Sequence, residues 1–92
     1  MDLLAKVATK IVQEQENIIG PIAFEQAQKI PGLTVNWDKR EVHLSGDETS
    51  IVDQLVEQYR HLFGQASVEV CKEAARSLLH DLPKNQIPHS LV

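Results

Sequence analysis

The chain has 92 residues, of which 42% are hydrophobic and 24% charged, and its formal net charge is −4. This composition is typical of a soluble globular domain and excludes an intrinsically disordered chain. Lys and Arg are too scattered to form the basic surface that neutralises phosphates, so we expect no nucleic-acid partner. The single cysteine, Cys71, excludes an intramolecular disulfide and a multi-cysteine metal cluster.

The sequence predicts no membrane segment. The N-terminal residues lack the apolar core of a signal peptide, and the longest apolar run, from Ile18 to Phe24, is far shorter than a bilayer span of about 18 residues. We therefore expect a cytoplasmic protein that has no membrane partner.

Residues 2–30 have the apolar spacing of an amphipathic helix, with Gln15 as the one polar position in the stripe. Gly20-Pro21 interrupts the segment, and a proline inside a helix costs about 3 kcal/mol. Alternatively, one helix ends near Ile19 and Pro21 occupies the first turn of a second, where its missing N–H is harmless. We favour a break or sharp kink, because a residue before a proline avoids helical angles.

Residues 33–44 predict a β-hairpin. Leu33, Val35 and Trp37 alternate with polar residues, and so do Val42 and Leu44, which is the period of a half-buried strand. Pairing Trp37 with Val42 leaves the connection 38–41 and places all the apolar residues on one face. Two strands alone are marginal in water, so this face must pack against helices or another hairpin.

The C-terminal part predicts a second helical segment. Ser45 and Glu48 have the spacing of a capping box, and an apolar stripe then runs from Val52 to Leu78. Gly64 interrupts this stripe. It costs only about 1 kcal/mol inside a helix, so we expect the helix to continue, although an end at Gly64 with a new start capped by Ser67 is the alternative.

The length of that segment leads to a prediction about assembly. A compact domain of this size is roughly 32 Å across, whereas an unbroken helix over residues 45–79 would be about 50 Å long. If the helix is continuous, a second chain must cover its overhang; if Gly64 breaks it, the halves fold together. We predict a homodimer, the commonest symmetric assembly.

No catalytic or ligand motif of any strength is present, so we expect neither an enzyme nor a cofactor or metal site. Ser77, His80 and Asp81 are the nearest approach to a catalytic set, but no oxyanion hole or water-excluding cleft accompanies them. Cys71 is interpreted as a buried structural thiol. The alternative is a redox or cross-dimer thiol beside Lys72.

The predicted fold is α+β, with a long or kinked N-terminal helix, a two-stranded antiparallel hairpin and a long C-terminal helix. Residues 1–82 form a single domain and residues 83–92, which begin at Pro83, a flexible tail. The expected function is a non-enzymatic protein–protein interaction or adaptor module that acts as a homodimer and docks a protein partner.

The alternative is a small regulatory or ligand-binding domain with an apolar pocket between hairpin and helices, and a cavity of several hundred Å³ near Trp37 would favour it. Trp37 is more typical of a core residue. If it is partly exposed beside Lys39 and Arg40, it would be a natural anchor for a partner, because Trp and Arg are enriched in binding hot spots. The remaining candidates for a partner or dimer interface lie on the C-terminal stripe: Tyr59, Leu62, Phe63 and Val70.

Overall fold

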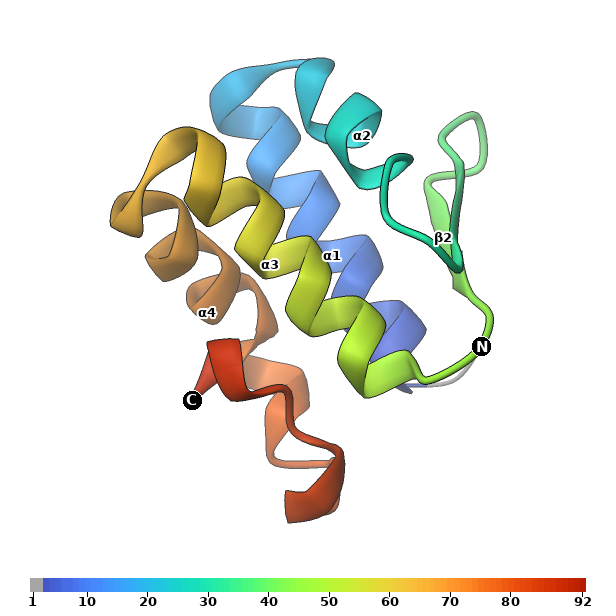
Figure 1. Ribbon diagram of the computed structural model, residues 1–92, viewed down its shortest axis with the longest axis vertical. Helices are drawn as coiled ribbons and strands as arrows, with labels where there is room; N and C mark the ends of the chain where they lie inside the picture. The colour runs from blue at the N-terminus through green and yellow to red at the C-terminus, as the bar shows by residue number, and fades with distance from the viewer. Residues whose placement is uncertain (1–2) are drawn as a thin grey trace.

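The computed structural model describes residues 3–92 and confirms the α+β order of helices around a central hairpin (Figure 1). Two short 3-10 turns follow the last helix. The elements in chain order are α1 (Leu3–Ile19), α2 (Ile22–Ala27), β1 (Leu33–Asn36), β2 (Glu41–Leu44), α3 (Glu48–Phe63), α4 (Gln65–Leu79), η1 (Lys84–Gln86) and η2 (His89–Leu91).

Helix α1 lies at the centre of the core. It packs against α2, α3, α4 and β2, which are all the helices and strands except β1. Its apolar stripe has no exposed surface at Val7, Ala8, Ile11 and Val12. The spacing of apolar residues seen in the sequence thus becomes the inner face of the helix.

The break at Gly20-Pro21 is confirmed. α1 ends at Ile19, Gly20 adopts a φ of +77°, and α2 starts at Ile22. The short α2 is then fixed to α3, because the Tyr59 hydroxyl donates a hydrogen bond of 2.6 Å to the Ala23 carbonyl.

The expected continuity through Gly64 is wrong. Gly64 has φ 82° and ψ −172°, a backbone conformation that essentially only glycine adopts, and α3 and α4 fold back against each other around it (Figure 1). The molecule measures 31 × 26 × 21 Å, so no helix overhangs the core. The overhang argument for a second chain therefore fails, and dimerisation needs separate support.

The hairpin is confirmed, but its register differs from the predicted one by two residues. Val35 pairs with Val42 and Asn36 with Glu41, so the connection is 37–40 rather than 38–41. A shift of two residues keeps each side chain on its original face. The apolar face therefore still points inward, and the Val42 N–H donates a hydrogen bond of 3.1 Å to Thr9 Oγ1 on α1.

The predicted capping box at the start of α3 is also wrong. Asp47 is the N-cap, and its carboxylate accepts a hydrogen bond of 3.2 Å from the Ser50 N–H. Ser45 instead donates its backbone N–H to the Gly32 carbonyl and closes the base of the hairpin.

Within residues 83–92, the turn η2 packs against α3 and α4 (Figure 1). Pro88 is fully buried and Leu91 is 4% exposed, whereas the rest of this segment has partly or fully exposed side chains. The mobility expected for this tail stays a prediction.

Candidate protein-interaction surface

The structure divides the predicted interface residues into three places. Trp37 and Arg40 lie at the tip of the hairpin, and Leu62, Phe63 and Val70 lie around the turn from α3 to α4. Tyr59 lies in the core with no exposed surface, and burial raises the pKa of its hydroxyl well above the ordinary value. It therefore contributes no surface to a partner in this conformation.

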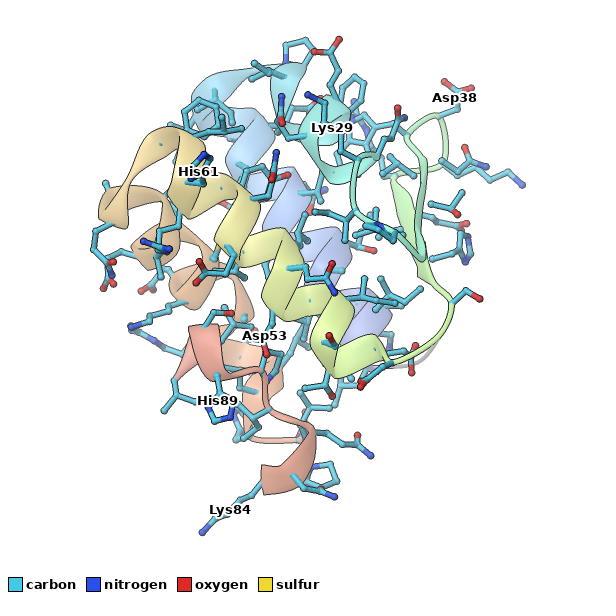
Figure 2. All side chains as sticks on the ribbon, in the orientation of Figure 1. Lys29, Asp38, Asp53, His61, Lys84 and His89 are labelled. Carbon is cyan, nitrogen blue, oxygen red and sulfur yellow. The ribbon has the colours of Figure 1, made fainter. Side chains whose placement is uncertain are left out.

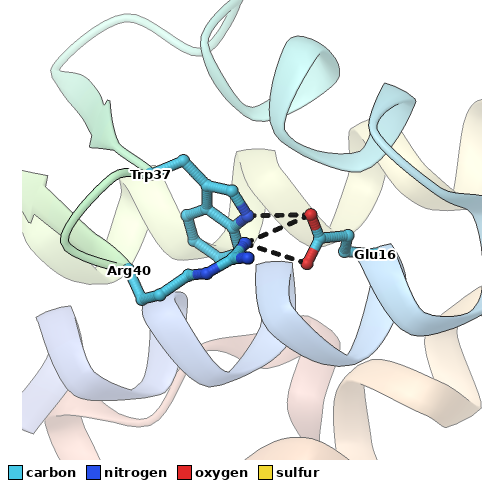
Figure 3. A network of polar contacts seen from close by, with 3 residues as sticks. All are labelled: Glu16, Trp37 and Arg40. Atoms are coloured by element: carbon cyan, nitrogen blue, oxygen red, sulfur yellow. Dashed lines mark hydrogen bonds and ion pairs between the residues drawn. The ribbon is translucent and has the colours of Figure 1, made fainter.

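At the hairpin tip, the predicted anchor is engaged within the chain (Figure 3). Trp37 Nε1 donates a hydrogen bond of 2.9 Å to Glu16 Oε2, and the Trp37 ring stacks on Phe24 with centroids 5.9 Å apart. Arg40 forms an ion pair of 3.2 Å with Glu16 and lies 5.0 Å from the Trp37 ring centroid. These contacts clamp the hairpin to α1, so the best-supported role of Trp37 is structural.

At the α3–α4 turn, large apolar side chains are exposed to solvent. Ile18 is 63% exposed, Leu62 46% and Phe63 38%. They come from the end of α1 and the end of α3. We refer to these three residues, with the partly exposed Ile19 and Val70, as the end surface.

All end-surface residues except Leu62 line a hollow between α1 and α4. This hollow has a volume of about 210 Å³, and its lining consists of Gln15, Ile18, Ile19, Phe63, Ala66, Ser67 and Val70. A second hollow of about 370 Å³ shares Ile18 and Val70 with the first and extends along the two helices past Lys10 and Glu73. Together the two hollows form a groove with an apolar end and a charged rim.

A buried polar cluster lies at the base of the groove. Gln15 Nε2 donates to the Ser67 carbonyl at 2.9 Å and to Cys71 Sγ at 3.3 Å, while Ser67 Oγ donates to Gln15 Oε1 at 3.1 Å. Burial raises the pKa of Cys71 to about 11, against the smaller opposing effect of the Gln15 hydrogen bond. At neutral pH the thiol is therefore protonated and buried, which fits the structural interpretation of Cys71.

The other chemistry-bearing residues do not form a site within residues 3–92. Ser77, His80 and Asp81 are all exposed, and no hydrogen bond joins them in this part of the chain. Over the same residues, no group of three His, Cys, Asp or Glu side chains is placed to hold a metal ion. No helix among the described residues is long and apolar enough to cross a membrane.

The sequence missed Ile18 and Ile19 as surface residues, because their spacing continues the buried stripe of α1. The available signal was Gly20-Pro21: where a helix ends, its last apolar residues lose the neighbouring turn that would cover them. Comparisons with known protein families, curated proteins and solved structures find no match for this chain.

Proposed function

We propose that this chain is a non-enzymatic protein-interaction module that forms a homodimer through the end surface. The observation that carries this proposal is the pairing of two exposed apolar side chains, Ile18 and Phe63, on the lining of one apolar hollow, with exposed Leu62 adjacent to Phe63 in the chain. Single exposed apolar side chains are common on soluble proteins, but a contiguous group of them marks an interaction site.

A second copy of the chain is the partner that suits this surface best. The end surface presents a projecting side chain, Ile18, beside a hollow of about 210 Å³. Across a twofold axis, each copy can insert its Ile18 side chain into the hollow of the other. Both copies then use the same surface, as an isologous interface requires. The groove rim also carries both charges, Lys10 on α1 and Glu73 on α4, so twofold-related copies can set opposite charges against each other.

The alternative function, a ligand pocket between hairpin and helices, has no observation in its favour. Val42 has no exposed surface and Leu33 only 6%, so the inner face of the hairpin is filled by core packing. The five hollows described over residues 3–92 are lined by residues other than Trp37. A cytoplasmic location stays a prediction from the sequence.

Light scattering at increasing protein concentration tests the proposal. We expect the wild-type chain to approach the mass of two chains in the micromolar range, and Ile18→Asp to stay monomeric because it places a charge in the apolar contact. Val92→Asp is the matched control, since Val92 is 83% exposed and outside the end surface. A monomer mass for the wild type at every concentration, or a dimer that survives Ile18→Asp, would contradict the proposal.

A further inference from the structure

The last ten residues, 83–92, form a strap whose turn η2 covers the groove between α3 and α4. Two of its side chains, Pro88 and Leu91, are buried against these helices. The intervening His89 points outward, and Lys84 projects from the far end of the strap (Figure 2). The strap therefore packs into the groove through a proline and a leucine that are three positions apart in the sequence.

Two polar contacts fasten the strap to α3. Asp53 Oδ1 accepts hydrogen bonds from both the N–H and the Oγ of Ser90, at 3.0 and 2.7 Å. Thr49 Oγ1 donates to the Gln86 carbonyl at 3.2 Å. Within residues 3–92, the backbone-to-backbone hydrogen bonds of the strap all close inside the strap itself. A segment held this way opens at a lower free energy than the helices beneath it.

The strap does not fill its groove. A hollow of about 430 Å³ lies on its α4 side, lined by Lys72, Arg76, Leu79, His80, Ile87 and Leu91. Another of about 440 Å³ lies on its other side, lined by Thr49, Lys84, Asn85, Ile87, His89 and Val92. Ile87, the residue directly before the buried proline, is partly buried against the core and lines both hollows.

The α4 side of the groove is basic. Lys72, Arg76 and His80 follow one another at intervals of four residues and line the hollow beside Ile87. Lys72 and Arg76 form exposed ion pairs with Glu69 and Glu73 of their own helix, and such pairs are weak enough to be exchanged for another carboxylate. The strap contains no acidic side chain, so it supplies no side-chain carboxylate to this rim.

We propose that the groove between α3 and α4 is a peptide-docking site and that the strap is its internal occupant. The partner is a segment of another protein with the order acidic residue, proline, any residue, serine, leucine. Its proline and leucine take the places of Pro88 and Leu91, its serine binds Asp53, and its carboxylate meets Arg76 and Lys72. This site is separate from the end surface and does not depend on the dimer.

Fluorescence anisotropy with three labelled ten-residue peptides tests this proposal. The first has the sequence of residues 83–92, and the others carry Ile87→Glu or the uncharged Ile87→Gln. The full-length chain is used as wild type, as Leu91→Asp to release the strap, and as Ile22→Asp, the matched control at an exposed apolar residue of α2 outside the strap and its groove. Ser90→Ala is a milder release variant, since it removes only one hydrogen bond to Asp53.

We expect the Ile87→Glu peptide to bind Leu91→Asp about tenfold more tightly than the wild type or Ile22→Asp, because the tethered strap competes at high effective concentration. Ser90→Ala should give an intermediate affinity. In the Leu91→Asp chain, the Ile87→Glu peptide should bind about threefold more tightly than the Ile87→Gln peptide. Adding Arg76→Glu to the Leu91→Asp chain should remove its preference for the Ile87→Glu peptide.

Three results would overturn the proposal. In the first, neither Ser90→Ala nor a folded Leu91→Asp binds any of the peptides. In the second, the wild type and both release variants bind equally well, which would place the site away from the strap. In the third, the Ile87→Glu and Ile87→Gln peptides bind equally, which would remove the acidic residue from the partner. Each of these results leaves the dimer proposal unaffected.

Discussion

Gln15 is the residue whose role changes most between sequence and structure. In the sequence it is a polar interruption of an apolar stripe. In the fold it is 1% exposed, and both ends of its side-chain amide are bonded to α4 through Ser67 and Cys71. A buried amide is tolerated only when its hydrogen bonds are satisfied, so Gln15 fixes the register of α1 against α4.

Replacing Gln15 with alanine should lower the free energy of unfolding by about 2–4 kcal/mol, because it leaves a cavity and removes the hydrogen-bond partner of buried Ser67. Denaturant unfolding measures this change. Gln13→Ala, on the partly exposed side of the same helix, is the control and should change stability by less than about 0.5 kcal/mol. Equal losses in the two variants would show that the buried network does not stabilise the fold.

Because the Cys71 thiol is buried, we expect the folded chain to lose stability at alkaline pH. Because folding raises the pKa of the thiol from 9.0 to about 11, the folded chain holds its proton where the unfolded chain has released it. The stabilisation is complete below pH 9 and is lost as the pH rises to about 11, by at most about 2–3 kcal/mol. Unfolding free energies of wild type and Cys71→Ala, measured from pH 8 to 11, should converge; parallel curves would refute the buried-thiol assignment.

At the scale of elements, the two glycine interruptions show what sequence can predict. The break at Gly20-Pro21 was predictable because the cost of proline in a helix is local and large. At Gly64 the local cost is small, so tertiary packing decides. Folding α4 back buries its stripe against α1, a gain that no property of residues 62–66 reveals. The hairpin shows the same limit. Its alternating pattern predicted the face on which each side chain lies, but it did not predict the register of the two strands.

Gly64→Ala distinguishes the bent arrangement from a continuous helix. A Cβ at this position would meet no atom within 4 Å, so any effect comes from the backbone. We expect a loss of about 1–3 kcal/mol, because alanine is strained at this φ and ψ. In a continuous helix the same change would stabilise by about 1 kcal/mol. Thermal unfolding gives the sign, and Gln65→Ala on the exposed start of α4 is the neutral control.

The clamp of the hairpin on α1 can be tested through Glu16. Its carboxylate binds both Trp37 Nε1 and Arg40, so Glu16→Ala should cost about 1–2 kcal/mol and increase hydrogen exchange in β1 and β2. Glu14→Ala removes only an exposed ion pair with Lys10 and should cost less than about 0.5 kcal/mol. Unchanged exchange in the hairpin after Glu16→Ala would contradict the clamp.

At the scale of the whole molecule, the candidate surface was predictable only in part. Leu62, Phe63 and Val70 were identified from the stripe, although the reason given, an overhanging helix, does not hold. Periodicity identifies an apolar face but does not tell how far the core covers it. Tyr59 lies one turn from Phe63, yet it is buried while Phe63 is 38% exposed. That difference depends on where α1 and α2 end, which only the folded arrangement determines.

The dimer proposal is tested most directly by isotope-filtered NMR on an equal mixture of labelled and unlabelled chains. This measurement detects only proton pairs that belong to different copies. We expect intermolecular contacts from the Ile18 methyl groups to Phe63 and Val70, and none from Leu91 or the hairpin. Intermolecular contacts confined to other surfaces, or none at concentrations of about 1 mM, where even a weak dimer would be populated, would contradict self-association through the end surface.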